Sequence, residues 1–154
     1  MEFVLTVVFV TMLLFSILEI ILFVQTYSVL ADSAKEGVRY AIVHGSGNLS
    51  PSGPTCGGSP DPCADIDGPA GAPGTVPGYG SGYGVVKTYA VASLHDTTAM
   101  TVTVDYNPNS DNGAACNKTP CLVRVTVRYP YQPFFGMGWP TVTVYAAAEG
   151  RIAY

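Results

Sequence analysis

Hydrophobic residues open the chain as one unbroken block and become periodic only later. In the block Phe3–Val24, Glu19 is the only charged residue, and Glu2 lies at its edge. About 20 apolar residues suffice to cross a bilayer as a helix, and a carboxylate inside such a run is costly enough to indicate a function. The block lacks the basic start and the small-residue cleavage site of a secretory signal. We therefore expect it to stay on the mature protein.

The helical pattern continues beyond the block, with apolar residues on one side only. These residues recur every three or four positions and are Tyr27, Leu30, Ala31, Ala34, Val38, Ala41 and Ile42. The other side carries Asp32, Lys35, Glu36 and Arg39. Because Gly45 is a residue type that commonly ends helices, we predict one unbroken helix from Glu2 to His44, about 65 Å long. In this unit of residues 1–44, positions 1–24 would form a membrane or filament core, and positions 25–44 would pack on a head.

Residues 45–82 are rich in glycine and proline, a composition that cannot build a core and predicts a loop. Four cysteines lie outside the helix in two local pairs, Cys56 with Cys63 and Cys116 with Cys121. An even number of cysteines in such stretches is typical of disulfides in an oxidising compartment. Among the three connectivities that four cysteines allow, we favour the local one, which would pin the loop. Neither spacing is that of a structural zinc site.

The remaining residues, 83–154, predict a globular head with one short helix and three strands. Residues 83–95 fit a helix with Val86, Tyr89, Ala90 and Leu94 on one side. Three later segments alternate with a period of two, and each has one apolar face. Their apolar positions are Met100, Val102, Val104 and Tyr106, then Val123, Val125, Val127 and Tyr129, then Val142, Val144, Ala146 and Ala148. We predict an α+β fold in which the amphipathic half of the long helix covers the apolar face of a small antiparallel three-stranded sheet.

Charge and motifs argue against several classes of function. The net charge of −4 comes without any basic stripe, so we expect no nucleic-acid partner. The two histidines, His44 and His95, each fall at a predicted helix end. No nucleophile motif, phosphate-binding loop or paired-carboxylate arrangement accompanies them, so we expect neither an enzyme nor a cofactor.

Two groups of oxygen-bearing side chains and two acceptor motifs remain. Calcium prefers such oxygens, which the sequence offers at Asp61, Asp65 and Asp67 and again at Asp105, Asn107, Asn109 and Asp111. Turn chemistry explains these residues equally well, and we predict no metal site. Asn48 and Asn117 begin the N-x-Ser/Thr pattern and are candidate glycosylation sites.

Three stretches of the chain are similar to a known family. The first, EFVLTVVFVTMLLFSILEI, looks like the family's Glu-Phe opening, hydrophobic run and second Glu. The second is SAKEGVRYAIVHG, and the third joins VRVTVRYPYQPFF to WPTVTVYAAAEGRI. In this order they resemble the TadE-like pilins, or pseudopilins, of tight-adherence pilus systems.

The resemblance implies a type IV pilin-like fold and a structural subunit of an extracellular, type IV-like pilus filament that serves surface attachment. It also implies that the Glu2 carboxylate pairs with the terminal amine of a neighbouring subunit during assembly. We expect Glu19 to have a structural role in packing between helices, in which it is neutral, extends toward the membrane surface, or is hydrogen-bonded to Ser16 or Thr11 of a neighbour. The expected partners are copies of the chain itself, inner-membrane lipid before assembly, and the pilus assembly machinery. The expected location is the inner membrane first and the cell surface afterwards.

A second hypothesis uses the same hydrophobic segment differently. The chain would be a single-span, membrane-anchored binding module whose head captures a partner and never polymerises. A polymer should bury Glu2 against another chain, whereas an anchored monomer should not. The position of Glu2 therefore separates the two hypotheses.

Overall fold

The computed structural model describes residues 2–45, 84–94, 96–106, 118–133 and 140–153, together with Pro108 and Cys116. Within these residues the order of elements is one long helix, one short helix and three strands. The long helix packs on the three-stranded antiparallel sheet, which confirms the predicted α+β architecture. All of the predicted loop 45–82 except Gly45 lies outside the described residues.

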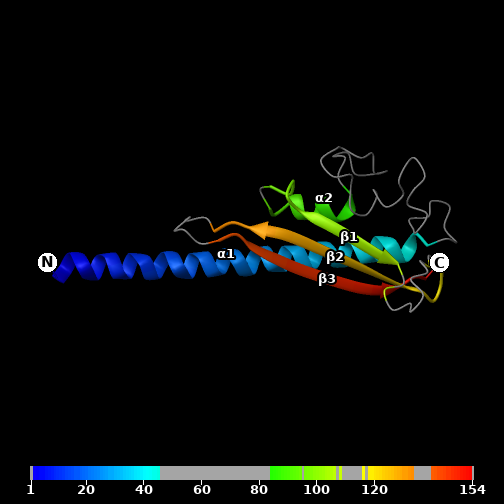
Figure 1. The fold of residues 1–154 in the computed structure, drawn as a ribbon, viewed down its shortest axis with the longest axis horizontal. Coiled ribbons are helices and arrows are strands. Elements are labelled where there is room, and N and C mark those ends of the chain that lie inside the picture. The colour runs from blue at the N-terminus through cyan, green and yellow to red at the C-terminus, as the bar shows by residue number, and fades with distance from the viewer. Residues whose placement is uncertain are drawn as a thin grey trace.

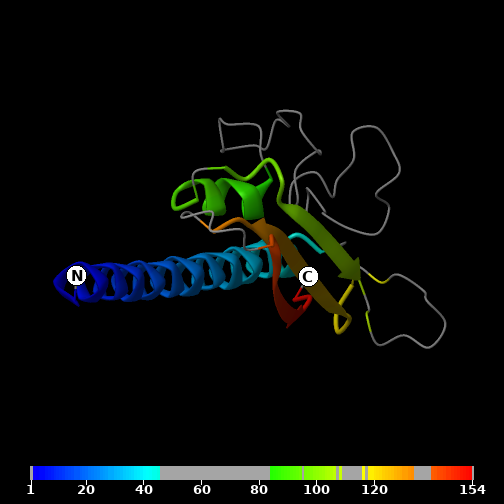
Figure 2. The same cartoon turned by 60° about the vertical axis from the view of Figure 1, so that its left-hand side comes forward.

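One unbroken helix, α1 (Glu2–Val43), contains both the apolar block and the amphipathic segment, as predicted. Its second half lies along the sheet, whereas its first half projects beyond the rest of the fold (Figures 1 and 2). At its end, the His44 backbone N–H donates to the Tyr40 carbonyl at 3.2 Å. The His44 ring stacks on the Tyr40 ring, with centroids 3.9 Å apart. His44 thus finishes the helix, in keeping with its predicted position at a helix end.

The buried side of α1 differs in part from the one that the sequence predicted, because it includes Thr26, Ser33 and Gly37. Its buried residues are Thr26, Leu30, Ser33, Ala34, Gly37, Val38 and Ala41. Tyr27, which we predicted on this side, is 50% exposed, because the buried stripe passes through Thr26 instead. Thr26 can be buried since its hydroxyl donates to the Leu22 carbonyl at 2.9 Å.

The sheet has the order β1 (Thr101–Tyr106), β2 (Leu122–Tyr131), β3 (Val142–Arg151), with β2 in the centre. Both pairings are antiparallel. The side chains of Val123, Val125 and Val127 are fully buried under α1, which confirms the period-two prediction for β2. On the opposite face, polar residues pair across the strands. Arg124 forms an ion pair with Glu149, and the Arg128 guanidinium lies 5.4 Å from the centre of the Tyr145 ring.

Two aromatic or apolar positions of the head depart from the prediction. The short helix α2 (Val85–Val91) buries Val86 and Ala90 against α1, as expected. Tyr89 is nevertheless 46% exposed, because the buried side of α2 extends toward Lys87. Val142 is also 46% exposed, because it lies at the end of the sheet beyond the covered part of the strand.

At Gly150 of β3 the sheet packs too close to α1 to leave room for a side chain. A Cβ atom placed there would lie 2.5 Å from Ile42 Cδ1 and 2.6 Å from Val38 Cγ1. Directly beyond the strand, the Ala153 N–H donates to the Ile42 carbonyl of α1 at 3.2 Å. Glycine at position 150 therefore sets how tightly the last strand can pack on the helix.

Candidate membrane and assembly surface

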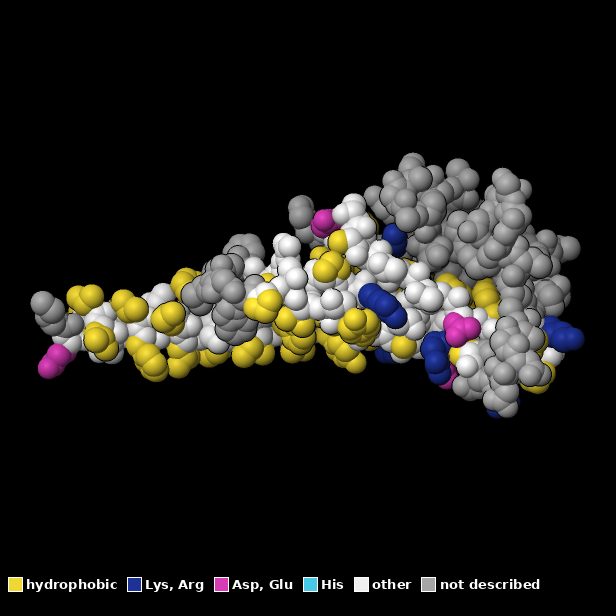
Figure 3. All heavy atoms as spheres, in the orientation of Figure 1, with side chains coloured by type: hydrophobic (Ala, Val, Ile, Leu, Met, Phe, Trp, Pro, Cys, Tyr) yellow, Lys and Arg dark blue, Asp and Glu magenta, His cyan; other side chains and the backbone are white. Residues whose placement is uncertain are grey.

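The first half of α1 exposes all of its large hydrophobic side chains. Between Phe3 and Val24, even the least exposed of them, Phe23, keeps 36% of its surface accessible. Hydrophobic side chains cover this projecting part of the helix, whereas Lys, Arg, Asp and Glu gather mainly on the head (Figure 3). Contiguous exposed apolar surface of this extent marks a site of contact with a membrane or with other protein chains.

By length and composition this helix can cross a membrane. Its most hydrophobic window has a mean hydropathy of 2.8, and none of that window is buried inside the fold. A helix in the core of a soluble domain would instead have this window covered by its own chain. The segment is thus compatible with membrane anchoring, as the sequence predicted.

Hydroxyl groups in this half are used within the helix. The Thr6 hydroxyl donates to the Glu2 carbonyl at 3.0 Å, and the Thr11 hydroxyl donates to the Val7 carbonyl at 2.7 Å. Such bonds satisfy a hydroxyl in an apolar environment without any external partner. We predicted Thr11 or Ser16 of a neighbour as a partner for Glu19, and that prediction stays open.

Glu2 lies in the first turn of α1 and is exposed. A carboxylate at this end is favoured by the positive end of the helix dipole. Met1, the residue before it, lies outside the described residues. The single chain therefore leaves Glu2 available at the tip of the apolar half, and its pairing with a neighbouring subunit stays a prediction.

Glu19 has a partner within its own chain that sequence reasoning did not identify. The Tyr131 hydroxyl at the end of β2 donates to Glu19 Oε1 at 2.5 Å, across 112 positions of sequence. The Tyr131 ring is 8% exposed and meets the Phe23 ring edge to face, with centroids 5.4 Å apart. Burial of the ring raises the pKa of Tyr131 to about 12, and the hydrogen bond and charge of Glu19 act in the same direction. This bond fastens the apolar half of α1 to the sheet.

A groove of about 280 Å³ lies beside this hydrogen bond. Its helix side is formed by Ser16, Glu19, Ile20 and Phe23, and its sheet side by Tyr131, Pro133 and Val142. Most of the lining is apolar, and the carboxylate and hydroxyl of the Glu19–Tyr131 pair lie at its margin. The groove therefore joins the exposed apolar surface of α1 to the end of the sheet.

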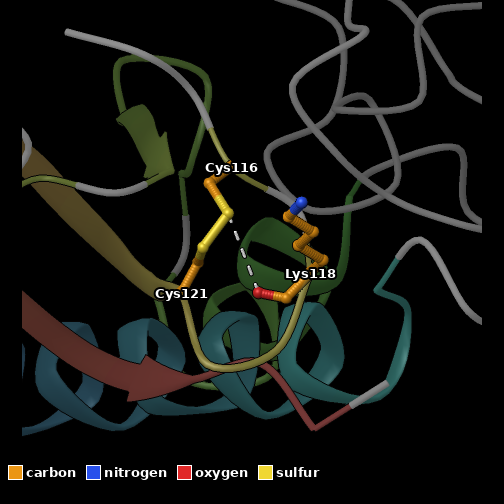
Figure 4. Close-up of a disulfide and its surroundings, with 3 residues drawn as sticks. All are labelled: Cys116, Lys118 and Cys121. Carbon is orange, nitrogen blue, oxygen red and sulfur yellow. Dashed lines mark hydrogen bonds between the residues drawn. A yellow bond between two sulfur atoms is a disulfide. The ribbon is translucent and has the colours of Figure 1, made fainter. Parts of the chain in front are cut away.

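The second predicted disulfide is present at the far end of β2. Cys116 and Cys121 are bonded, with their Cα atoms 5.9 Å apart (Figure 4). The Cys121 N–H donates to the Lys118 carbonyl at 2.8 Å, which closes the turn between the two cysteines. The Cys121 carbonyl accepts from the Ile152 N–H at 2.9 Å, so the turn is tied to the end of β3. Cys56 and Cys63 lie outside the described residues, as do Asn48 and Asn117.

Within the described part of the chain, no three His, Cys, Asp or Glu side chains lie close enough together to hold a metal ion. Asp105 is exposed on β1. His95 lies outside the described ranges. So do the remaining residues that were weighed as calcium ligands, Asp61, Asp65, Asp67, Asn107, Asn109 and Asp111. Among the described residues, the exposed half of α1 and the groove beside it form the candidate functional surface.

Comparisons of the chain with protein-family models, with curated proteins and with solved structures found no match.

Proposed function

We propose that this chain is a structural subunit of an extracellular, type IV-like pilus filament of the tight-adherence class. The observation that carries the proposal is the division of α1 into a half that the sheet covers and a half with all large apolar side chains exposed. The exposed half requires lipid before assembly and other helices after it. Copies of the same chain offer that environment, because their first halves are apolar on every side.

Transfer from membrane to filament requires more than hydrophobic burial. Lipid tails are as apolar as leucine, so moving the helix into a bundle must be driven by packing and by polar pairing. Glu2 stands at the tip of the helix as an exposed carboxylate. In a bundle it would be desolvated and would require a cationic partner, for which the amino terminus of a neighbouring subunit is suited.

Glu2→Ala tests this assignment in cells. We expect the variant to be made, inserted in the membrane and oxidised at its cysteines, but to yield few or no filaments. Removing one partner of a buried ion pair typically costs about 3–5 kcal/mol, which would disfavour each subunit addition more than about 100-fold. The readout is electron microscopy of sheared surface filaments with identification of their peptides.

Glu36→Ala is the matched control, because it removes a carboxylate from the amphipathic half of the same helix, where Glu36 pairs with Arg39 at 3.3 Å. Such exposed pairs contribute little to stability, so filament yield should stay normal. Normal filaments from Glu2→Ala cells would refute the role of Glu2. If wild-type cells form no filament containing this chain, the membrane-anchored binding module is the correct function instead.

A further inference from the structure

The sheet reaches past the end of the membrane-length run of α1. Tyr131 and Val142, which pair across β2 and β3, line the groove with Ser16 and Phe23 of the helix. Ser16 precedes Val24, the last residue of the run, by about 12 Å along the helix axis. The end of the sheet therefore lies alongside the last two turns of the run.

Because the end of the sheet overlaps the apolar run of α1, a bilayer that holds the whole run would reach the sheet. The hydrocarbon core is about 30 Å thick, and Phe3–Val24 extends over about 33 Å as a helix, so nearly the whole run is needed to cross it. A span that ended before Ser16 would extend over only about 20 Å. When α1 is anchored in a membrane with this run across it, the end of the sheet that is bonded to Glu19 and packed on Phe23 would lie at the level of the lipid.

The chemistry of this end of the sheet suits the interfacial layer of a membrane. Arg128 is the last charged residue of β2 and Glu149 the first of β3, so the sequence from Tyr129 to Ala148 contains no charge. Tyrosine and tryptophan concentrate at membrane–water interfaces because their rings are apolar and carry a polar group. Tyr131 is itself buried, with its ring against Phe23 and its hydroxyl on Glu19, so it holds this uncharged end of the sheet on the apolar half of α1.

We propose that the end of the sheet at Pro133 and Val142, with the buried Tyr131 behind it, is a lipid-contact surface that sits in the interfacial layer of the membrane holding α1. The proposal rests on the membrane stage of the proposed function and is independent of polymerisation. The Tyr131 hydroxyl gives the Glu19 carboxylate a donor at a depth where water is scarce. The head is thereby seated partly in the membrane, with its charged outer sheet face in water.

Fluorescence quenching in vesicles tests this placement. The full chain is reconstituted into phosphatidylcholine vesicles that carry a doxyl quencher either near the headgroup or near the bilayer centre. Trp139 is the only tryptophan in the sequence, so a Trp139→Phe background allows a new probe at Val142→Trp. Ala147→Trp is the matched control, since it is exposed on the same strand about 17 Å farther along.

We expect the Val142→Trp emission to be quenched most by the doxyl group near the headgroup, and to be about threefold less accessible to aqueous acrylamide than that of Ala147→Trp. Equal acrylamide quenching of the two probes would overturn the proposal. So would protection of Val142→Trp from both lipid and aqueous quenchers at high protein-to-lipid ratio, because that result assigns the surface to a second copy of the chain. A chain that does not float with the vesicles would overturn both this proposal and membrane anchoring.

The result is separable from the test of filament formation. Filaments together with an acrylamide-accessible Val142→Trp would leave the proposed function standing and remove the lipid-contact surface. Lipid quenching without filaments would support the lipid-contact surface and refute the filament. The chain would then be an anchored module that does not polymerise.

Discussion

Gly150→Ala places one methyl group at a tight contact between β3 and α1. The new Cβ would lie 2.5 Å from Ile42 Cδ1 and 2.6 Å from Val38 Cγ1, well inside van der Waals contact. The Ile42 methyl is the end of a flexible side chain and can move, whereas Val38 is β-branched and 4% exposed. Overpacking of this kind costs about 1–3 kcal/mol, partly offset by the lower entropy of alanine in the unfolded chain. We expect a net loss of about 1–2 kcal/mol in the free energy of unfolding.

A double-mutant cycle with Val38→Ala isolates the contact. Val38→Ala alone removes two buried methyl groups and should cost about 1.5 kcal/mol or more. In the double variant, the methyl group introduced by Gly150→Ala enters the space that the Val38 side chain vacates. The combined cost should therefore be smaller than the sum by at least about 0.5 kcal/mol. The free energies are measured by urea unfolding of the full chain in mild detergent. The near-ultraviolet circular dichroism of the tyrosines monitors the unfolding.

Val8→Ala is the control, because it removes the same two methyl groups from α1 where the side chain is 55% exposed. Its effect should add to that of Gly150→Ala without coupling. Additive costs for Val38→Ala and Gly150→Ala, or a Gly150→Ala variant as stable as the wild type, would refute the packing argument.

Three further predictions address the site and the fold. Replacing Cys116 and Cys121 with serine should lower the free energy of unfolding by about 2 kcal/mol, the value that chain entropy gives for so short a loop, as measured by urea unfolding of the full chain. The pKa of Tyr131 rises from 10.0 in the unfolded chain to about 12 in the folded protein. The protonated Tyr131 hydroxyl therefore stabilises the folded state fully below about pH 10, and this stabilisation is lost as the pH rises through about 12. Tyr131→Phe should therefore be less stable than the wild type by about 1.5–3 kcal/mol near neutral pH, and unfolding curves should show the difference shrinking above pH 10. Leu30→Ala should cost about 2–5 kcal/mol because Leu30 is fully buried, whereas Leu14→Ala, at a residue 55% exposed, should leave the stability of the head almost unchanged in the same assay.

The long helix and the sheet could be predicted because each leaves a periodic pattern in the sequence. The block Phe3–Val24 and the spacing that follows it permit no break in the helix, and β-branched residues mark the three strands. The Cys116–Cys121 bond was predictable for a different reason. A short separation makes local pairing geometrically easy.

The Glu19–Tyr131 pair could not be placed in the same way. Period-two alternation in β2 extends from Val123 through Tyr129 to Tyr131, which puts Tyr131 on the face turned toward α1. The helix residue that Tyr131 contacts depends on the position of the sheet along the axis of α1. No local sequence pattern determines this position. The same position decides that Gly150 meets Val38 and Ile42. The helices and strands follow from local sequence patterns, whereas the contacts between them follow from the packing of the whole head.

The position of the sheet along α1 also divides the helix into one part that packs on the head and one part that stays exposed. Residues from Thr26 to Ala41 bury their inner side against the head, so their substitution should act on folding. Residues from Phe3 to Leu18 contribute no buried side chain to the head, so their substitution should act on membrane insertion and on contact between chains. Glu19 belongs to both parts, because it lies in the apolar run and is bonded to the sheet through Tyr131. Through this bond, Glu19 holds the apolar half of α1 in a fixed orientation relative to the sheet.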